Sequence, residues 1–129
     1  MEFTRFLNDA RDAAGLTSTN AAYTMAQGVL LTFRRRLDAK QGLRFATTLP
    51  AVLRAIFVAD WDIDEPRGQF DDRAAMTKGV QALRPNHNYS PDTAIRNVAT
   101  ALRKHVDEEI FDRVLMQLLP RATECWRVD

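Results

Sequence analysis

Apolar residues recur at every third or fourth position along most of the chain, which is the spacing of an α-helix with one buried side. Short alternations of polar and apolar residues also occur, but turn residues bound none of them, so no strand is predicted. The pattern therefore predicts an all-α fold, a compact bundle of seven or eight helices built from two similar halves. The predicted helices span residues 2–14, 20–37, 39–49, 50–59, 70–83, 90–106 and 107–119, with a short helical turn ending near residue 126.

Residues with known preferences for helix ends stand where these helices should begin and end. Gly15 follows the first helix, where a left-handed residue commonly closes the last turn. Asp38 and Gln41 have the spacing of a capping box, and Asp107 precedes two further acids that favour a helix start. Ser90, followed by proline and aspartate, predicts that a helix begins there.

Each predicted helix has a set of apolar positions that should face the core. In the first half these positions are Phe3, Phe6, Leu7, Ala10, Ala14, Ala22, Ala26, Val29, Phe33, Leu37, Ala39, Leu43, Ala46 and Leu49. In the second half they are Phe70, Ala74, Val80, Leu83, Ala94, Val98, Ala101, Leu102, Val106, Ile110, Phe111, Val114, Leu115 and Leu118. Glycines inside predicted helices, at positions 28, 42 and 79, indicate either a close approach between helices or a kink that opens a small pocket.

Two stretches of the chain resemble each other. When residues 29–50 are aligned with residues 98–120, apolar stripes match, the basic triplet Arg34-Arg35-Arg36 matches Arg103-Lys104-His105, and both stretches end in Leu-Pro. We therefore predict a single domain, 1–129, with an internal repeat of 1–59 and 69–128 joined by the loop 60–68. Half a chain of this length is too small to fold well alone, so the halves should share one core.

The segment around the first Leu-Pro carries a recognisable motif. It resembles the bacterial domain of unknown function 2267 family, which has the pattern Leu-Pro-x-x-Leu-Arg-Gly, followed by a hydrophobic residue, four further positions and Trp. The matching residues are Leu49, Pro50, Leu53, Arg54 and Trp61, with Ala55 where glycine is usual. The resemblance extends over nearly the whole chain, including the two-half layout. It implies a compact helical domain without an established activity, and it transfers no catalytic residue.

Composition restricts the class of protein. Hydrophobic residues make up 46% and charged residues 27% of the 129 residues, which is ordinary for a soluble globular protein and excludes a disordered, collagen-like or membrane-spanning chain. The net charge of +1 gives no general attraction to nucleic acid or anionic lipid, so we expect neither nucleic-acid binding nor membrane insertion. The single cysteine, Cys125, and the lack of a visible signal peptide predict a cytoplasmic protein.

No combination of residues predicts catalysis, a metal or a cofactor. Asp60, Asp62 and Asp64 alternate as in a calcium loop, but Glu65 stands where that loop needs glycine. Neither of the two histidines belongs to a Glu-x-x-His pair of the kind found in helical metal sites. Cys125 is interpreted as an inert apolar residue.

The candidate binding residues are basic or aromatic: Arg34, Arg35, Arg36, Arg54, Phe57 and Trp61. Arg34, Arg35 and Arg36 either grip phosphates or an acidic partner, or simply complement the carboxyl end of a helix. Arg54 is the only charge in the helix 50–59, and it either forms an ion pair with the aspartates of the loop or anchors a ligand beside Trp61.

The helix 50–59 is apolar in every direction around its axis. It should be enclosed by both halves, with Phe57 in the core, or else be shared with a second molecule. The main functional hypothesis is a non-catalytic protein-interaction or accessory module of the bacterial cytoplasm, with a protein partner or self-association. The alternative is a small-molecule-binding protein or enzyme with a pocket between the halves near Arg54 and Trp61.

Overall fold

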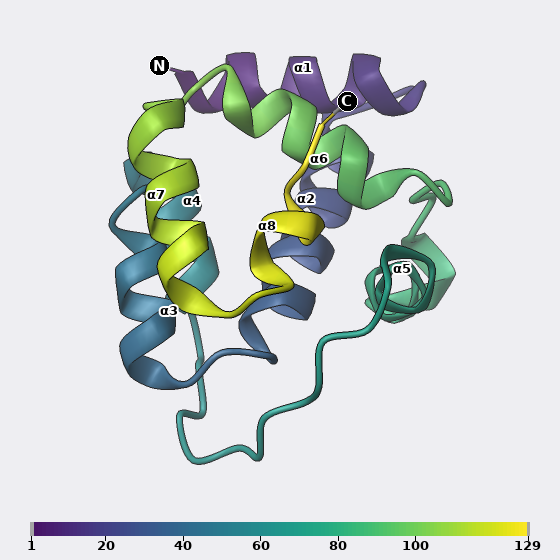
Figure 1. The fold of residues 1–129 in the computed structure, drawn as a ribbon. Helices are drawn as coiled ribbons and strands as arrows, with labels where there is room; N and C mark the ends of the chain where they lie inside the picture. The colour runs from purple at the N-terminus through teal and green to yellow at the C-terminus, as the bar shows by residue number, and fades with distance from the viewer. Residues whose placement is uncertain (1, 129) are drawn as a thin grey trace.

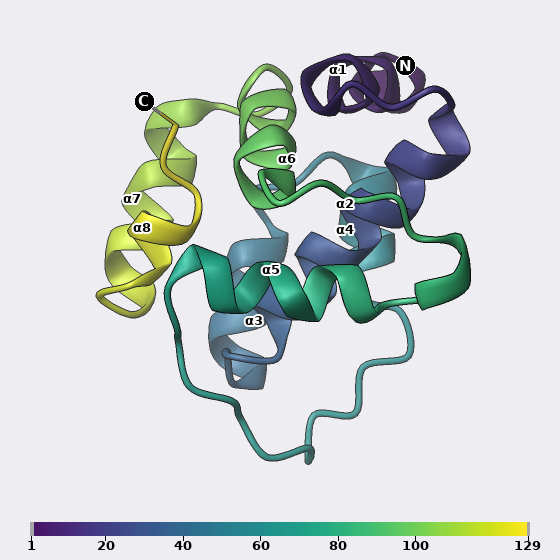
Figure 2. The same ribbon diagram turned by 90° about the vertical axis from the view of Figure 1, so that its right-hand side faces the viewer.

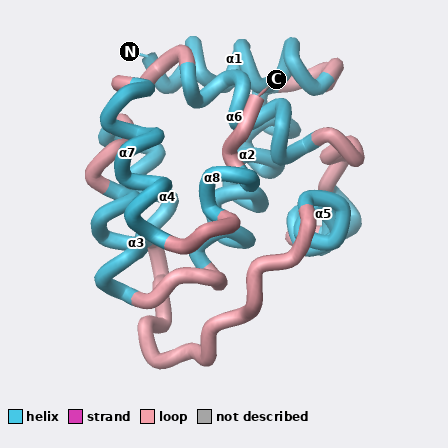
Figure 3. Tube along the Cα trace, viewed as in Figure 1, coloured by secondary structure: helices cyan, strands magenta, loops and turns pink. Residues whose placement is uncertain are grey.

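The computed structural model describes residues 2–128, and this part of the chain consists of helices and loops, as the sequence predicts (Figures 1 and 3). The α-helices are α1 (Glu2–Ala14), α2 (Thr19–Arg34), α3 (Ala39–Ala46), α4 (Ala51–Val58), α5 (Arg73–Ala82), α6 (Ala94–Arg103), α7 (Glu108–Leu118) and α8 (Ala122–Cys125), and a 3₁₀ turn, η1, covers Pro85–His87. None of these helices is long and apolar enough to cross a bilayer.

Most of the predicted helix ends are confirmed. Gly15 has a φ of +67° directly after α1, a conformation that glycine adopts without strain. At the start of α3, the Asp38 carboxylate accepts a hydrogen bond from the Gln41 amide and the Gln41 side chain accepts one from the Asp38 amide, which is a complete capping box. The Asp107 carboxylate accepts from the Ile110 amide and begins α7 in the same way.

The predicted helix start at Ser90 is wrong, because α6 begins only at Ala94. The chain around Ser90 is held by the end of α5 instead. The Gln81 side chain donates to the Ser90 carbonyl, and the Asn88 side chain accepts from the Ser90 amide while it donates to the Val80 and Leu83 carbonyls. These contacts keep the Ser90 backbone out of the helix, and its side chain is buried rather than capping.

Helix α2 lies at the centre of the molecule and contacts α1, α4, α5 and α6. Helix α1 crosses the top of the molecule over α6, while α3, α4 and α7 form the wall on the left of Figure 1. Helix α5 covers the opposite side of α2 and faces the viewer in Figure 2. The long connection from α4 to α5 passes around the lower edge of the molecule in both views.

Aromatic rings from both halves meet in the core. Phe33 of α2 and Phe45 of α3 have ring centroids 4.7 Å apart, and the Trp126 ring packs 5.4 Å from the first and 5.5 Å from the second. Phe111 of α7 lies 5.8 Å from Trp126, and Phe57 of α4 lies 5.1 Å from Phe45. The two halves therefore share one aromatic core.

Several predicted core positions face solvent instead. The stripe on α2 is buried as expected, but Leu43 is 58% exposed, Ile110 is 45% exposed and Ala74 is also exposed. In α3 the inner side is occupied by Gly42, Phe45 and Ala46, about a quarter turn from Leu43. The predicted stripe and the observed stripe are neighbouring sides of the same short helix. The side that carries the large Phe45 ring is the one that faces the core.

Helix α4 is not enclosed, so that expectation is wrong. Only Leu53 and Phe57 are buried, and Val52 is 42% exposed. The helix lies at the outside of the bundle with its main contacts to α2 and α3, and two buried residues one turn apart suffice to attach it. Ile56 and Val58 are partly buried against the core, and the remaining residues, Ala51, Val52, Arg54 and Ala55, face outward.

Candidate functional site

Three of the predicted site residues, Arg34, Phe57 and Trp61, lie together where α2, α4 and the following loop meet. Arg34 is only 8% exposed, and its Nη1 donates to the carbonyls of Phe57 and Ala59, each at 2.9 Å. Its guanidinium carbon lies 5.5 Å from the centroid of the Trp61 ring, which packs edge-on against Phe57. This is a cation–π contact combined with two hydrogen bonds to the end of a helix.

The positive charge of Arg34 therefore has its partners inside the molecule. Burial, followed by the like charge of Arg35, lowers the pKa of Arg34, and the nearby carboxylates of Glu65 and Asp60 partly offset that change. An arginine stays protonated at neutral pH despite such a change. Arg34 thus holds a permanent positive charge against the carboxyl end of α4 and fixes where the loop begins.

The triplet Arg34-Arg35-Arg36 does not form one basic surface. Arg35 is exposed, whereas Arg36 is partly buried and its Nη1 donates to the Thr32 carbonyl at 2.7 Å. The Arg36 Nη2 lies 3.7 Å from a carboxylate oxygen of Asp71. Successive residues at a helix end point in directions about 100° apart, so the three cations reach three different surroundings.

Arg54 does not join Trp61, and it does not pair with the aspartates of the loop. Its Nε donates to the Ala46 carbonyl at 3.2 Å and its Nη2 to the Leu49 carbonyl at 3.0 Å. The last carbonyls of a helix lack partners within the helix, and Arg54, one turn after Pro50, reaches back to that of Ala46, the last residue of α3, and to that of Leu49 in the following turn. Its role in the structure is to cap α3, and the expected ion pair is replaced by these bonds.

A small pocket of about 250 Å³ does adjoin Trp61. Arg34 and Arg35 contribute to its lining, together with the carboxylates of Asp38 and Glu65. Arg54 and Phe57 do not line it. The predicted pocket near Arg54 and Trp61 is therefore only partly present, and its walls carry charges of both signs.

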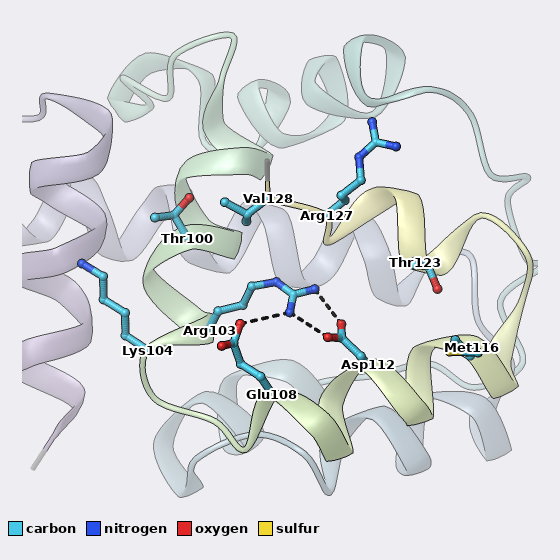
Figure 4. Close-up of a pocket in the computed structure, with 9 residues that line it drawn as sticks. All are labelled: Thr100, Arg103, Lys104, Glu108, Asp112, Met116, Thr123, Arg127 and Val128. Atoms are coloured by element: carbon cyan, nitrogen blue, oxygen red, sulfur yellow. Dashed lines mark hydrogen bonds and ion pairs between the residues drawn. The ribbon is translucent and has the colours of Figure 1, made fainter.

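A larger pocket of about 710 Å³ lies in the second half, between the end of α6, helix α7 and the C-terminal segment (Figure 4). Arg103 crosses it and makes two bonds to Asp112, at 2.8 and 3.2 Å, and one to Glu108 at 3.2 Å. Burial opposes the charge of Arg103, but the hydrogen bond and charge of Asp112, with those of Glu108, outweigh it and raise the pKa of Arg103. The principal cation of this pocket is thus neutralised by two carboxylates.

Arg103 and Arg34 make equivalent contacts in the two halves. The Arg103 Nε donates to the Trp126 carbonyl at 3.0 Å, directly after α8, just as Arg34 donates to carbonyls at the end of α4. Both arginines also lie over an aromatic ring, Arg103 at 5.2 Å from the Phe111 centroid. The first residue of each basic triplet therefore attaches the short helix that follows Leu-Pro.

The remaining candidate chemistry has structural partners. Among residues 2–128, no three side chains of the metal-binding types are grouped to hold an ion. His105 Nε2 lies 2.8 Å from a carboxylate oxygen of Asp9 and joins the end of α6 to α1. Cys125 is 3% exposed, and burial raises the pKa of its thiol to about 12, although Arg73 and Arg36 act in the opposite direction.

The comparison with known families identifies the chain. The model of a family described as an uncharacterized conserved protein (DUF2267) matches residues 3–124. The chain belongs to this family. The match begins in α1 and ends in α8, so the DUF2267 region includes both halves and the loop between them. No curated protein matches the chain. The family description attaches no activity to DUF2267.

Proposed function

We propose that this DUF2267 domain is a non-catalytic protein-interaction or accessory module of the bacterial cytoplasm. The observation that carries the proposal is the outward surface of α4, where Ala51, Val52, Ala55 and Ala59 are all exposed. The only charged side chain of α4, Arg54, bends back to the carbonyls at the end of α3. An exposed surface with apolar side chains and no internal partner is typical of a protein-binding site.

The size and shape of this surface indicate the partner. An eight-residue helix is about 12 Å long, and its outer side is far smaller than the roughly 800 Å² that each partner of a stable complex buries. The surface therefore suits a transient contact rather than an obligate dimer. Small residues one turn apart, such as Ala51, Ala55 and Ala59, allow another helix to approach closely. The partner we propose is an amphipathic helix of another protein.

The alternative, a small molecule held between Arg54 and Trp61, has less support. Arg54 caps α3 and does not line the pocket beside Trp61, and that pocket is small. The interaction surface of α4 is accordingly the better candidate for the function of the domain.

The test compares two charge insertions at exposed apolar positions. Val52→Glu places a charge on the outward side of α4, and Met116→Glu places one at a 77% exposed position on α7. Proteins captured from the source cell by the wild type are purified and their binding is measured again by calorimetry. We expect Val52→Glu to weaken binding at least tenfold and Met116→Glu to leave it unchanged.

Light scattering of the purified wild type completes the test. A monomer is expected at micromolar concentrations, and a dimer that Val52→Glu dissociates would identify a second copy as the partner instead. Equal binding by both variants, or the lack of any partner together with a monomeric wild type, would contradict the proposal.

A further inference from the structure

A third pocket lies between the two halves, and we call it the inter-half pocket. Its volume is about 590 Å³. One wall comes from the end of α2, one from the loop before α5, and one from the turn between α7 and α8. The lining residues are Arg36, Arg67, Gly68, Gln69, Phe70, Leu119, Pro120 and Arg121.

The charged residues of this lining are all arginines. Arg36, Arg67 and Arg121 approach the pocket from three separate segments of the chain, and no carboxylate lines it. The two pockets described above differ in this respect, because Asp112 and Glu108 line the pocket of Figure 4 and Asp38 and Glu65 line the pocket beside Trp61. Cations from distant segments with no acid among them favour an anionic ligand.

Three carboxylates lie near these arginines without lining the pocket, and two of the three N···O distances are long. Arg36 Nη2 lies 3.7 Å from Asp71, and Arg67 Nη1 lies 3.9 Å from Asp38. Among residues 2–128, only Arg121 has a close carboxylate partner, Glu124, whose oxygen lies 3.2 Å from its Nε. Arg36 Nη1 also donates to the Thr32 carbonyl at 2.7 Å, and Arg67 Nη1 to the Gln41 side chain at 3.4 Å. In addition, the buried Nε of Arg36 has no hydrogen-bond partner within the described chain. A guanidinium has five N–H donors, so each of the three retains capacity for a ligand.

The apolar part of the pocket is held in place by both halves. The Phe70 ring packs 5.7 Å from Phe33 of the core, and the Phe70 carbonyl accepts a hydrogen bond from Arg121 at 3.3 Å. The Gly68 amide donates to the Arg35 carbonyl at 2.9 Å, which fastens the loop to the end of α2. The pocket therefore exists before any ligand arrives, and little ordering cost would oppose binding.

We propose that the inter-half pocket binds a small organic anion with an oxyanion group, phosphate or carboxylate, on an apolar body. The planar fork of a guanidinium matches both oxyanion groups with paired N–H···O bonds. Phe70, Leu119 and Pro120 then contact the apolar body. This inference does not depend on the interaction proposed for α4, which lies on another part of the surface.

The test is an NMR titration of the ¹⁵N-labelled full chain with four probes: phenyl phosphate, benzoate, inorganic phosphate and phenol. We expect phenyl phosphate and benzoate to shift the amides of Arg67–Phe70, Leu119 and Arg121. Inorganic phosphate should bind several-fold more weakly, because it lacks the apolar body, and phenol should not bind. Affinity for the anionic probes should fall as salt is raised, since ions screen partly exposed charge pairs. Whichever of the two aromatic anions binds more tightly identifies the oxyanion group.

Substitutions of single arginines test which side chains bind the anion. Arg67→Gln and Arg121→Gln change half-exposed side chains, so both proteins should fold, and each should weaken phenyl phosphate binding by about fivefold or more. Arg113→Gln is the control, since Arg113 is a 60% exposed arginine of α7 that lines none of these pockets. Unchanged affinity in both pocket variants, shifts confined to other surfaces, or equal binding of phenol would overturn the proposal.

Discussion

At the scale of single residues, the chemistry of a side chain here depends on which backbone groups lie near it. Arg34, Arg54 and Arg103 all use their guanidinium groups to bind carbonyls at helix ends. Each of these carbonyls belongs to a segment brought close by the fold. Arg34 and Arg54, which the sequence predicted as candidate binding residues, therefore stabilise the fold. Arg67 and Arg121, which belong to no predicted motif, line a pocket instead.

Cys125 should be unreactive in the native protein and should make stability depend on alkaline pH. Burial raises the pKa of its thiol to about 12 from an ordinary value of 9.0, so the unfolded chain loses this proton first. The stabilisation is complete below pH 9 and is lost as pH rises toward 12, by at most about 1.4 kcal/mol per pH unit. Urea melts from pH 8 to 10.5 should therefore show the wild type losing stability relative to Cys125→Ala. Parallel pH profiles would contradict this assignment.

Gly42 should not tolerate a side chain, although it lies inside a helix. A Cβ at this position would overlap the ring of Trp61, which packs directly on the glycine. Gly42→Ala should displace the indole, shift its fluorescence and destabilise the fold by about 1–3 kcal/mol, the usual range for overpacking. Gly79→Ala is the control: its Cβ would lie at ordinary contact distance, 3.5 Å, from Thr32, so this change should be neutral or stabilising by up to about 1 kcal/mol. Similar melting temperatures for the two variants would argue against the packing described.

At the scale of the elements, short helices are held by few contacts at defined positions. Helix α4 is attached by Leu53 and Phe57 on its inner side and by Arg34 at its carboxyl end. Helix α8 is likewise attached by Ala122 and Cys125 inside and by Arg103 at its end. In α4 this attachment leaves Ala51, Val52, Arg54 and Ala55 exposed, so its outer side is free for the partner that we propose.

Phe57 should therefore dominate the stability of α4. Phe57→Ala should cost about 3–5 kcal/mol, the usual range for a fully buried phenylalanine, because its ring fills the core beside Phe45. Val52→Ala, on the exposed side of the same helix, should change the free energy of unfolding by less than about 0.5 kcal/mol. Denaturant melts of the two variants measure the difference, and equal losses would mean that α4 is covered on both sides.

At the scale of the whole molecule, the halves depend on each other because the aromatic core lies between them. Phe33, Phe45 and Phe57 come from the first half, and Phe111 and Trp126 from the second. The internal repeat itself remains a prediction. It requires that residues 29–50 superpose on residues 98–120 with the same interhelical angle and with Phe33 over Leu102.

The shared core predicts a single unfolding transition. Trp61 reports on the first half and Trp126 on the second, so the variants Trp126→Phe and Trp61→Phe each leave one fluorescent probe. In each variant, the fluorescence and far-UV circular dichroism transitions in urea should coincide, as two-state unfolding requires. A first-half probe that changes at a different urea concentration from the helix signal would show that the halves unfold separately.

The sequence alone determined which segments are helical and how most helices end. Helical period and capping depend on residues within one or two turns, so the Asp38–Gln41 box, Gly15 and the α2 stripe could all be predicted. Only the tertiary structure decided how far each apolar surface is covered and which partner each charge meets. α4 faces outward because its neighbours cover one side, and Arg54 caps α3 because that helix ends beside it. The inter-half pocket joins residues 36, 67 and 121, which no local pattern connects, because their proximity follows from the packing of the two halves around one core.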